Sequence, residues 1–185
     1  MKCRFIQRPQ KRSFAQQDCY DSAMGNTSFH HLDLDQVDVR ILDHLQEHGR
    51  ASNLELAQVA RLSPAQCMRR HRRLEEAGLI ARYEARLSAP HLGFAVTAFI
   101  HVSMERGHLR ELSKFTDEIA LLGEVLECYS VTGDFDYVLK VVARDLQALS
   151  RFLMNTLVRL PGVDGVRSSV CMDEIKCTSR LPVAT

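Results

Sequence analysis

The sequence predicts an α+β protein with an N-terminal winged helix-turn-helix domain joined to a C-terminal ferredoxin-like βαββαβ domain. Two observations favour this fold class. Residues 32–87 contain three short segments of helical apolar spacing, each with capping signals, and then one alternating segment. Residues 94–175 switch between strand and helix spacing in the order β-α-β-β-α-β. A chain of 185 residues is long enough for two small domains of this kind.

The composition is that of an ordinary globular protein. Hydrophobic residues make up 45% and charged residues 25% of the chain, which excludes wholesale disorder. No apolar run approaches the roughly 18 residues of a membrane-spanning helix, and the first residues lack the apolar core of a secretory signal. Because the six cysteines contain no C-x-x-C pair, we expect reduced thiols, a cytoplasmic location, no bound metal and no cofactor.

The chain divides into five parts by composition and pattern. We expect a basic, disordered extension over 1–31, the winged helix-turn-helix domain over 32–87, a linker over 88–93, the ferredoxin-like domain over 94–175 and a tail over 176–185. The extension holds five basic and two acidic residues, a balance that suits non-specific contacts with phosphates. The alternative is that translation starts at Met24.

The first two helices of the middle domain are bounded by side chains typical of helix ends. Asp35 is the expected N-cap of the first helix, with Asp38 in its first turn and Gly49 as its stop. The apolar stripe of this helix consists of Val37, Ile41, Leu42 and Leu45. Ser52 and Glu55 then form a capping box that opens the second helix.

The third helix repeats the same start signal after a two-residue turn. Ser63 is its expected N-cap, Pro64 stands at N1, Gln66 at N3, and Gly78 ends it. Two capped helices joined by so short a turn have the geometry of a helix-turn-helix. Residues 79–87 then alternate like a strand, which predicts the wing.

The third helix has an arginine-rich outer face. On a helical wheel the inner face is defined by Cys67, His71 and Leu74. The outer face holds Ala65, Arg69, Arg72 and Arg73, with Arg70 near the boundary. Arginine can bond guanine or phosphate, glutamine can bond adenine, and a helix N-terminus can bond phosphate. We therefore predict that double-stranded DNA is bound by Ser63, Ala65, Gln66, Met68, Arg69, Arg70, Arg72, Arg73 and, from the wing, Arg82. A helix pair that docks on another protein is the competing interpretation.

The same patterns assign the C-terminal domain. Its first strand has one face made of Val96, Ala98, Ile100 and Val102, and its first helix has a stripe made of Leu109, Leu112, Phe115 and Ile119. Two β-rich runs, 125–131 and 137–142, flank a hairpin connection. Asp145 caps a second helix, and the last strand covers 163–172. The stripe of that helix is Leu146, Leu149, Leu153, Leu157 and Leu160. Because both helices cover one sheet face, a second subunit is the economical cover for the other.

Motifs in both domains resemble the Lrp/AsnC family, the feast/famine transcription regulators of bacteria and archaea. They are Leu34-Asp35-Gln36-Val37-Asp38-Val39-Arg40-Ile41-Leu42, Leu62-Ser63-Pro64-x-x-Cys67-x-Arg69-Arg70, Leu74-Glu75-x-x-Gly78-Leu79-Ile80, Gly133-Asp134-x-Asp136-Tyr137 and Pro161-Gly162-Val163. The resemblance covers about residues 34–180 and leaves the first thirty or so residues without a counterpart. It implies a homodimer built on the ferredoxin-like domains, which often assembles into octamers, with an amino acid or related small effector bound between subunits.

One loop of the C-terminal domain has the chemistry to hold an amino acid. Residues 132–136 offer a glycine that permits close backbone approach and two carboxylates that can bind an ammonium group. Glycine and aspartate are also turn residues, so a simple hairpin turn is the alternative. The resemblance places the effector at this same loop, near a subunit boundary. The expected effector-binding residues are Ser103, Thr132, Gly133, Asp134, Asp136 and Ser168.

Two histidine features call for separate interpretations. His71 stands on the inner face where the resemblance implies an apolar residue, so we expect a neutral ring bonded to a backbone group, with a pH-sensitive core contact as the alternative. His44-x-x-Glu47-His48 matches the pattern of inverted zinc peptidases. Because Glu47 faces away from the apolar stripe and nothing nearby builds a cleft, we expect the chain not to be an enzyme.

These observations predict a sequence-specific, homo-oligomeric transcription regulator that responds to an amino acid and has no membrane partner. The alternative is an amino-acid-sensing regulatory subunit of a metabolic enzyme that does not bind DNA. The basic third helix favours the regulator.

Overall fold

The structure, a computed structural model, describes residues 33–105 and 109–183. Its contacts form two compact units. The helical unit comprises residues 33–83 together with 180–183, and the sheet unit comprises the described residues between 84 and 179. The extension predicted over residues 1–31 lies outside the described residues. In the described ranges, no helix has the length and apolar character needed to cross a membrane.

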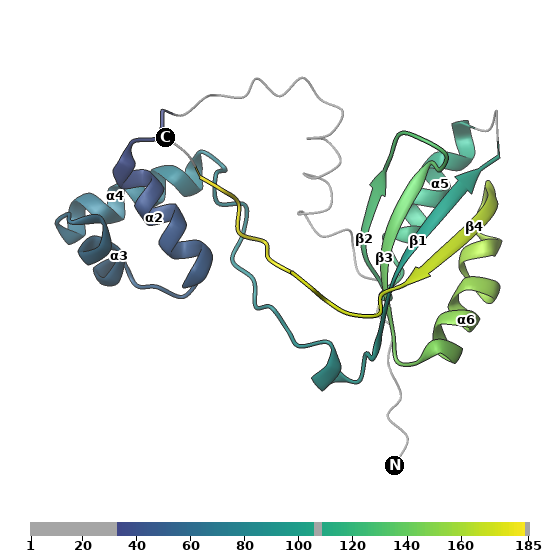
Figure 1. Ribbon diagram of the computed structural model, residues 1–185. Helices are drawn as coiled ribbons and strands as arrows, with labels where there is room; N and C mark the ends of the chain where they lie inside the picture. Colours follow the sequence, from purple (N-terminus) through teal and green to yellow (C-terminus); the bar gives the residue numbers. More distant parts are fainter. Residues whose placement is uncertain (1–32, 106–108, 184–185) are drawn as a thin grey trace, which may run out of the picture. The chain divides into compact units, whose positions relative to one another are not determined.

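Three helices form the helical unit, and their starts follow the predicted capping signals (Figure 1). They are α2 (Gln36–Glu47), α3 (Asn53–Ala60) and α4 (Pro64–Glu76). The side chains of Asp35, Ser52 and Ser63 each accept a hydrogen bond from the N3 backbone, and the N3 side chain accepts one from the N-cap backbone in return. The three predicted helices are therefore confirmed, each with a capping box.

The helix ends are less regular than the sequence predicts. Gly49 follows the C-cap His48 of α2, as predicted, but its φ is not left-handed. Instead α3 ends on Arg61, whose φ of 57° and ψ of 48° are left-handed. This conformation costs an L-residue roughly 1–2 kcal/mol. It lets the Leu62 amide donate to the Ala57 carbonyl at 2.9 Å, which closes the turn ahead of α4.

A small core joins the three helices of this unit. Its buried residues are Ile41, Leu42, Leu45, Leu56, Ala57, Ala60, Cys67 and Leu74. The set includes three members of the predicted stripe of α2 and two of the three predicted inner residues of α4. The inner face of α4 is thus fixed by apolar packing, which leaves the opposite face of the helix exposed.

The described chain does not form the strand predicted over residues 79–87. Among the described residues, no strand lies between α4 and the 3-10 turn η1 (Pro90–Leu92). A strand needs a hydrogen-bonded neighbour, and the four strands of the structure pair only among themselves. Several large side chains of residues 79–87 also stay exposed, including Leu79, Tyr83 and Leu87. Alternation alone was therefore insufficient, because no strand of the described chain pairs with this segment.

The sheet unit has the predicted ferredoxin-like topology. Its strands are β1 (Val96–Met104), β2 (Val125–Ser130), β3 (Tyr137–Ala143) and β4 (Val163–Val170), in the sheet order β2-β3-β1-β4 with every pair antiparallel. Its helices are α5 (Leu109–Ile119) and α6 (Leu146–Asn155), followed by the 3-10 turn η2 (Leu157–Arg159). The order β1-α5-β2-β3-α6-β4 confirms the β-α-β-β-α-β prediction (Figure 1).

Both helices pack on one face of this sheet. The core contains Ala98, Ile100, Val102, Phe115, Ile119, Leu139, Val141, Ala143, Leu149, Phe152, Leu157 and Leu160. The predicted stripes are mostly correct, although Leu146 is 62% exposed because it stands in the first turn of α6. The side chains of Leu109 and Leu112 lie outside the described part of the chain. On the opposite sheet face, Phe99 is 41% exposed, so this face has no cover within the unit.

Candidate functional site

The outer face of α4 presents several of the residues predicted to bind DNA. Exposed side chains on this helix include Ala65, Gln66, Met68, Arg69, Arg72 and Arg73. At its N-terminus, the Ser63 hydroxyl donates to the side-chain carbonyl of Gln66 at 2.9 Å. That carbonyl is therefore part of the capping box, and the helix begins at a fixed position. The predicted wing residue Arg82 lies in the irregular segment that follows the helix.

Two of the α4 arginines are bonded to acids on and before α2. Asp38 is fully buried, and its two carboxylate oxygens accept from Arg70 Nη1 at 3.0 Å and from Arg73 Nη2 at 2.5 Å. Arg70 Nη1 also donates to Asp35 at 2.7 Å. These bonds to Asp35 and Asp38 raise the pKa of Arg70. The pKa of Asp35 is lowered, first by the hydrogen bond from the Asp38 amide and then by Arg70.

This acid–arginine cluster of Asp35, Asp38, Arg70 and Arg73 was not predicted from the sequence. The helical wheel placed Arg73 on the outer face, but its guanidinium reaches back to α2. Both pairs are spaced three residues apart, which is a signal in hindsight because each pair shares one helix face. The crossing of α2 and α4 that brings the pairs together is not encoded in either segment alone.

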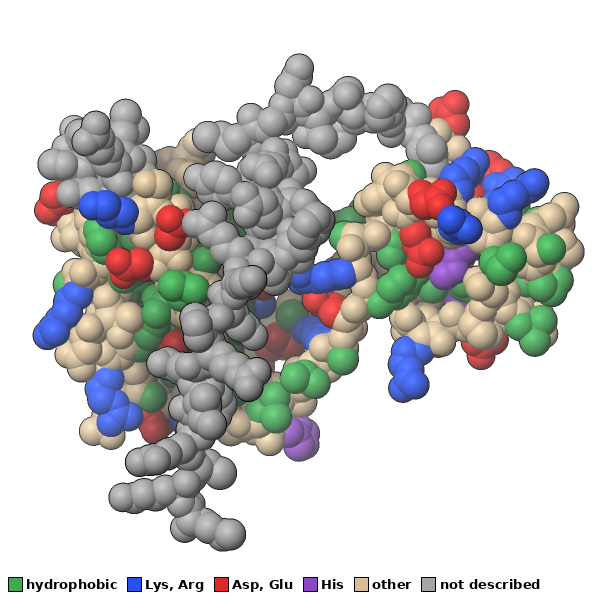
Figure 2. Space-filling model, turned by 180° about the vertical axis from the view of Figure 1, so that it is seen from behind, with side chains coloured by type: hydrophobic (Ala, Val, Ile, Leu, Met, Phe, Trp, Pro, Cys, Tyr) green, Lys and Arg blue, Asp and Glu red, His purple; other side chains and the backbone are tan. Residues whose placement is uncertain are grey.

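The other two arginines of α4 are more available. Arg72 pairs with Glu76 at 2.7 Å across one helical turn, and the Arg72 side chain is 77% exposed. Arg69 is exposed and has no ion pair or hydrogen bond with any residue that the structure describes. Figure 2 shows basic and acidic side chains mixed on this unit, rather than a uniformly basic surface. On α4, Arg69 can therefore contact a polyanion without breaking any bond to the acid–arginine cluster. Arg72 can do the same by giving up its exposed pair with Glu76.

His71 is bonded by side chains, which corrects the expected bond to a backbone group. Its Nδ1 lies 2.9 Å from Asn53 Oδ1 and its Nε2 lies 2.6 Å from the Tyr83 hydroxyl. The Tyr83 hydroxyl also donates to Glu75 at 3.0 Å. Because a phenol has one proton to donate, the Tyr83 oxygen then accepts from His71 Nε2. These side-chain contacts link α3, α4 and the segment after α4.

A pocket of about 620 Å³ lies at one end of the sheet. It is lined by Ser103, Met104, Glu105, Gly133, Asp134, Asp136 and Asp164. The structure therefore brings together four of the six predicted effector residues. Thr132 does not line the pocket, and Ser168 is paired with Ile100 on the helix-covered side of β4. Sequence reasoning missed the rest of the lining because it depends on antiparallel pairing between the end of β1 and the start of β4.

The loop between β2 and β3 is fixed to β1 by one of its two acids. The Asp136 carboxylate accepts from the Met104 amide at 2.7 Å, and the Asp136 amide donates to the Val102 carbonyl at 3.0 Å. Gly133 has a φ of 125°, which L side chains rarely adopt, and the space around it is open. Glycine is therefore required at this position for its backbone conformation, not for the close approach that the sequence suggested. Asp134 is exposed at the pocket.

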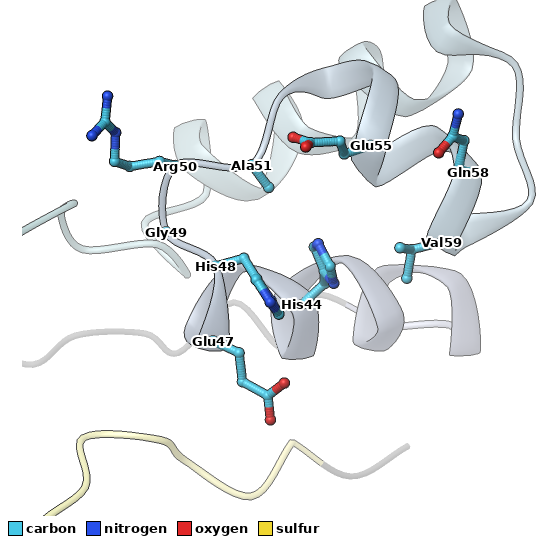
Figure 3. A pocket seen from close by; sticks show the side chains of 9 residues that line it. All are labelled: His44, Glu47, His48, Gly49, Arg50, Ala51, Glu55, Gln58 and Val59. Atoms are coloured by element: carbon cyan, nitrogen blue, oxygen red, sulfur yellow. The ribbon is translucent and has the colours of Figure 1, made fainter.

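A second hollow, of about 590 Å³, lies beside the predicted H-x-x-E-H motif (Figure 3). The His44 and His48 rings are stacked 4.4 Å apart, with 15° between their planes. Glu47 points away from them and pairs with Arg180. The described residues contain no cluster of three histidine, cysteine or acidic side chains arranged to hold a metal ion. The three motif residues therefore do not converge on one point.

Both parts of the chain match families of known proteins. Residues 34–81 match the winged helix-turn-helix DNA-binding family, and residues 97–181 match the Lrp/AsnC ligand binding domain. The chain is 41% identical over 153 residues to the leucine-responsive regulatory proteins of Klebsiella pneumoniae and Escherichia coli strain K12. These alignments cover 83% of this chain and 93% of each relative.

The chain is also similar to solved structures of transcriptional regulators. A transcriptional regulator from Neisseria meningitidis, crystallised as a complex with L-Met, is 39% identical with a TM-score of 0.78, and the match covers 80% of this chain and 96% of that one. An AsnC family transcriptional regulator from Agrobacterium tumefaciens is 32% identical with a TM-score of 0.76, over 80% and 97% of the two chains.

Proposed function

Because the chain belongs to the Lrp/AsnC family of DNA-binding transcriptional regulators, we propose that it binds operator DNA through α4 and an amino acid through the acidic pocket of the sheet unit. The observation that supports the DNA interface best is the fixed outer face of α4. That face starts at a capped N-terminus and exposes Gln66, Met68, Arg69 and Arg72. These side chains are long enough to reach base edges in a major groove.

The α4 residues take different roles in this proposal. Arg69 and Arg72 contact bases or phosphates, while Ser63 and the helix N-terminus contact phosphate. Ala65 and Met68 offer apolar contacts to thymine methyl groups. Arg70, Arg73 and Arg82 contribute phosphate contacts at the margin, since Arg70 and Arg73 remain bonded to Asp35 and Asp38. A binding helix with two such fixed arginines keeps its angle to α2 when it meets DNA.

The acidic pocket suits the ammonium group of an amino acid. Among the described residues, its lining includes Glu105, Asp134, Asp136 and Asp164 and no basic side chain. Since one carboxylate oxygen of Asp136 already accepts from the Met104 amide, Asp134 is the stronger candidate for direct contact with the ammonium. Ser103 supplies a hydroxyl at the same pocket, and Thr132 and Ser168 have supporting roles nearby. The L-Met bound to the Neisseria meningitidis regulator is the chemical precedent for such an effector.

The open face of the sheet is the proposed contact with a second copy of the chain. Phe99 is exposed there, and both helices cover the other face. The relatives are transcriptional regulators, and we propose that this chain has no enzymatic activity and works in the cytoplasm. We also propose that the domains have the boundaries predicted from the sequence, 32–87 and 94–175.

A mobility-shift experiment tests the proposed function. The duplex is the region upstream of the chain's own gene, and the added amino acids are L-leucine and L-methionine. We expect a sequence-specific shift that weakens in high salt because phosphate contacts release counterions. Absence of a shift at low salt, with and without the amino acids, would contradict the proposal.

A further inference from the structure

The end of the described chain returns to the helical unit and lies along α2. The Gln46 side chain makes a two-way contact with the backbone there: its Nε2 donates to the Leu181 carbonyl at 3.1 Å, and the Leu181 amide donates to its Oε1 at 2.6 Å. Arg180 pairs with Asp43 at 3.4 Å and with Glu47, which stands one helical turn further on. Val183 packs against the core of the unit. Residues 180–183 are called the strap below.

The strap occupies a face of α2 that has the right chemistry for it. Asp43, Gln46 and Glu47 follow the spacing i, i+3, i+4, so the three side chains share one face of the helix. Figure 3 shows the Glu47 side chain pointing away from His44 and His48, toward the C-terminal segment drawn in yellow. The two carboxylates can pair with the guanidinium of Arg180, and the Gln46 amide can bond the backbone of Leu181. This face of α2 is therefore complementary to the strap.

The contacts of the strap are of a kind that breaks and re-forms easily. The side chains of Arg180, Asp43 and Glu47 are between 40% and 51% exposed. Ion pairs at that exposure contribute little and weaken in salt, because water solvates both partners. The two amide contacts add a modest net contribution, since water competes for the same groups. Several weak contacts together therefore hold the strap on α2, and no single contact is strong enough to make the docking irreversible.

We propose that the strap is a reversible second attachment of the sheet unit to the helical unit, and that it pre-orders the helical unit for DNA. The chain passes into the sheet unit after Tyr83 and leaves it at Ser179. The first crossing runs through the irregular segment 79–87, which is a weak constraint on orientation. A second attachment restricts the rotation of the helical unit before DNA binds. DNA binding then loses less rotational entropy, so the affinity is higher. This role in DNA binding rests on the proposed function, whereas the docking of the strap does not.

Hydrogen exchange in the full chain tests the docking. The Leu181 amide should exchange about tenfold or more slowly in the parent than in Arg180→Glu, which sets a third carboxylate beside Asp43 and Glu47. Glu47→Arg combined with Arg180→Glu should restore the protection by reversing the ion pair. Lys176→Glu makes the same charge change at an exposed tail residue outside the strap, and should leave Leu181 protected. Equal exchange at Leu181 in the parent and in Arg180→Glu would overturn the proposal.

DNA affinity tests the pre-ordering role with the same four proteins. With the upstream duplex at one fixed salt concentration, Arg180→Glu should bind roughly three- to tenfold more weakly than the parent, and the charge-reversed pair should recover. Lys176→Glu measures the general effect of the lost positive charge. Equal losses in Arg180→Glu and Lys176→Glu would overturn the pre-ordering role even if the strap docks. If the parent binds no DNA, the proposed function and the pre-ordering role fail together, while Leu181 exchange still decides the docking.

Discussion

The acid–arginine cluster of the helical unit and the acidic pocket of the sheet unit differ in how their charges are paired. In the helical unit, Asp35 and Asp38 hold Arg70 and Arg73, so acids and bases neutralise each other inside the fold. In the sheet unit, the described residues that line the pocket include four acids and no basic side chain. Internal pairing sets the position of a helix, whereas unpaired charge around a cavity favours a ligand of opposite sign. The comparison separates groups that fix the structure from groups that remain available for binding.

The largest expected effect is the loss of the buried acid. Asp38→Ala should lower the free energy of unfolding by about 2–3 kcal/mol, less than for a fully buried pair because both arginines can turn to water. Urea denaturation measures the change. Asp33→Ala is the matched control, since Asp33 is exposed just before α2, and it should stay within about 0.5 kcal/mol of the parent. Similar stabilities for the two variants would mean that the acid–arginine cluster does not hold α4.

The next effect separates the two kinds of arginine on α4. Arg69→Ala should weaken operator binding by about 1–3 kcal/mol, if the side chain reads a base, without changing the free energy of unfolding. Arg73→Ala should lower the free energy of unfolding as well, because Asp38 loses one of its two partners. DNA titration and urea denaturation of both variants give the four values. A stability loss in Arg69→Ala as large as in Arg73→Ala would remove the distinction.

In the sheet unit, the two acids of the loop should respond differently. Asp134→Ala should weaken amino-acid binding by about 1.5–3 kcal/mol, the range for a hydrogen bond to a charged group, and leave DNA binding without effector unchanged. Asp136→Ala should also loosen the loop, because the Met104 amide loses its acceptor. Calorimetric titration with L-methionine and L-leucine tests both, with Asp173→Ala, at an exposed acid outside the pocket lining, as the control. Parent-like binding in both aspartate variants would reduce the loop to a hairpin turn.

The smallest effect is a dependence of stability on acid. The pKa of Asp35 is below its model-peptide value of 3.8, so Asp35 stabilises the fold above that pH and loses the contribution as pH falls through the lowered pKa. Asparagine caps a helix as well as aspartate does, so Asp35→Asn should keep α2 intact and flatten this part of the pH profile. Thermal unfolding between about pH 2 and pH 5 compares the two proteins. Identical profiles would show that the charge of Asp35 adds nothing to its bonds with the Asp38 amide and Arg70.

Local signals in the sequence predicted the elements well. Ser52, Ser63 and Asp145 start helices because a cap is satisfied within three residues. The alternation of Ala98, Ile100 and Val102 similarly defines one buried strand face. Such features depend on neighbours along the chain, and the resemblance of the motifs to a known family then linked them to a function.

Features that depend on distant partners could not be predicted in the same way. No strand forms over residues 79–87, because alternation does not show whether a second strand pairs with the segment. The bond from Arg73 to Asp38 was missed because Asp38 stands 35 residues earlier. The pocket was half predicted: the residues of one loop were found, but Glu105 and Asp164 join it through strand pairing. Contacts between elements that are far apart in the sequence therefore could not be predicted from local patterns.

The hydrogen bond from Tyr83 to Glu75 makes the absorbance and fluorescence of Tyr83 sensitive to the fold of the helical unit. The sequence has no tryptophan, so its intrinsic fluorescence comes from tyrosine, and Tyr83 is the tyrosine within the described residues of the helical unit. A phenol that donates to a carboxylate emits weakly and brightens when the bond opens. Burial of its hydroxyl and the bond to Glu75 raise the pKa of Tyr83 to about 12, so its ultraviolet ionisation band emerges in strong alkali. The difference spectrum between the parent and Tyr83→Phe thus follows the opening of one unit without any attached dye.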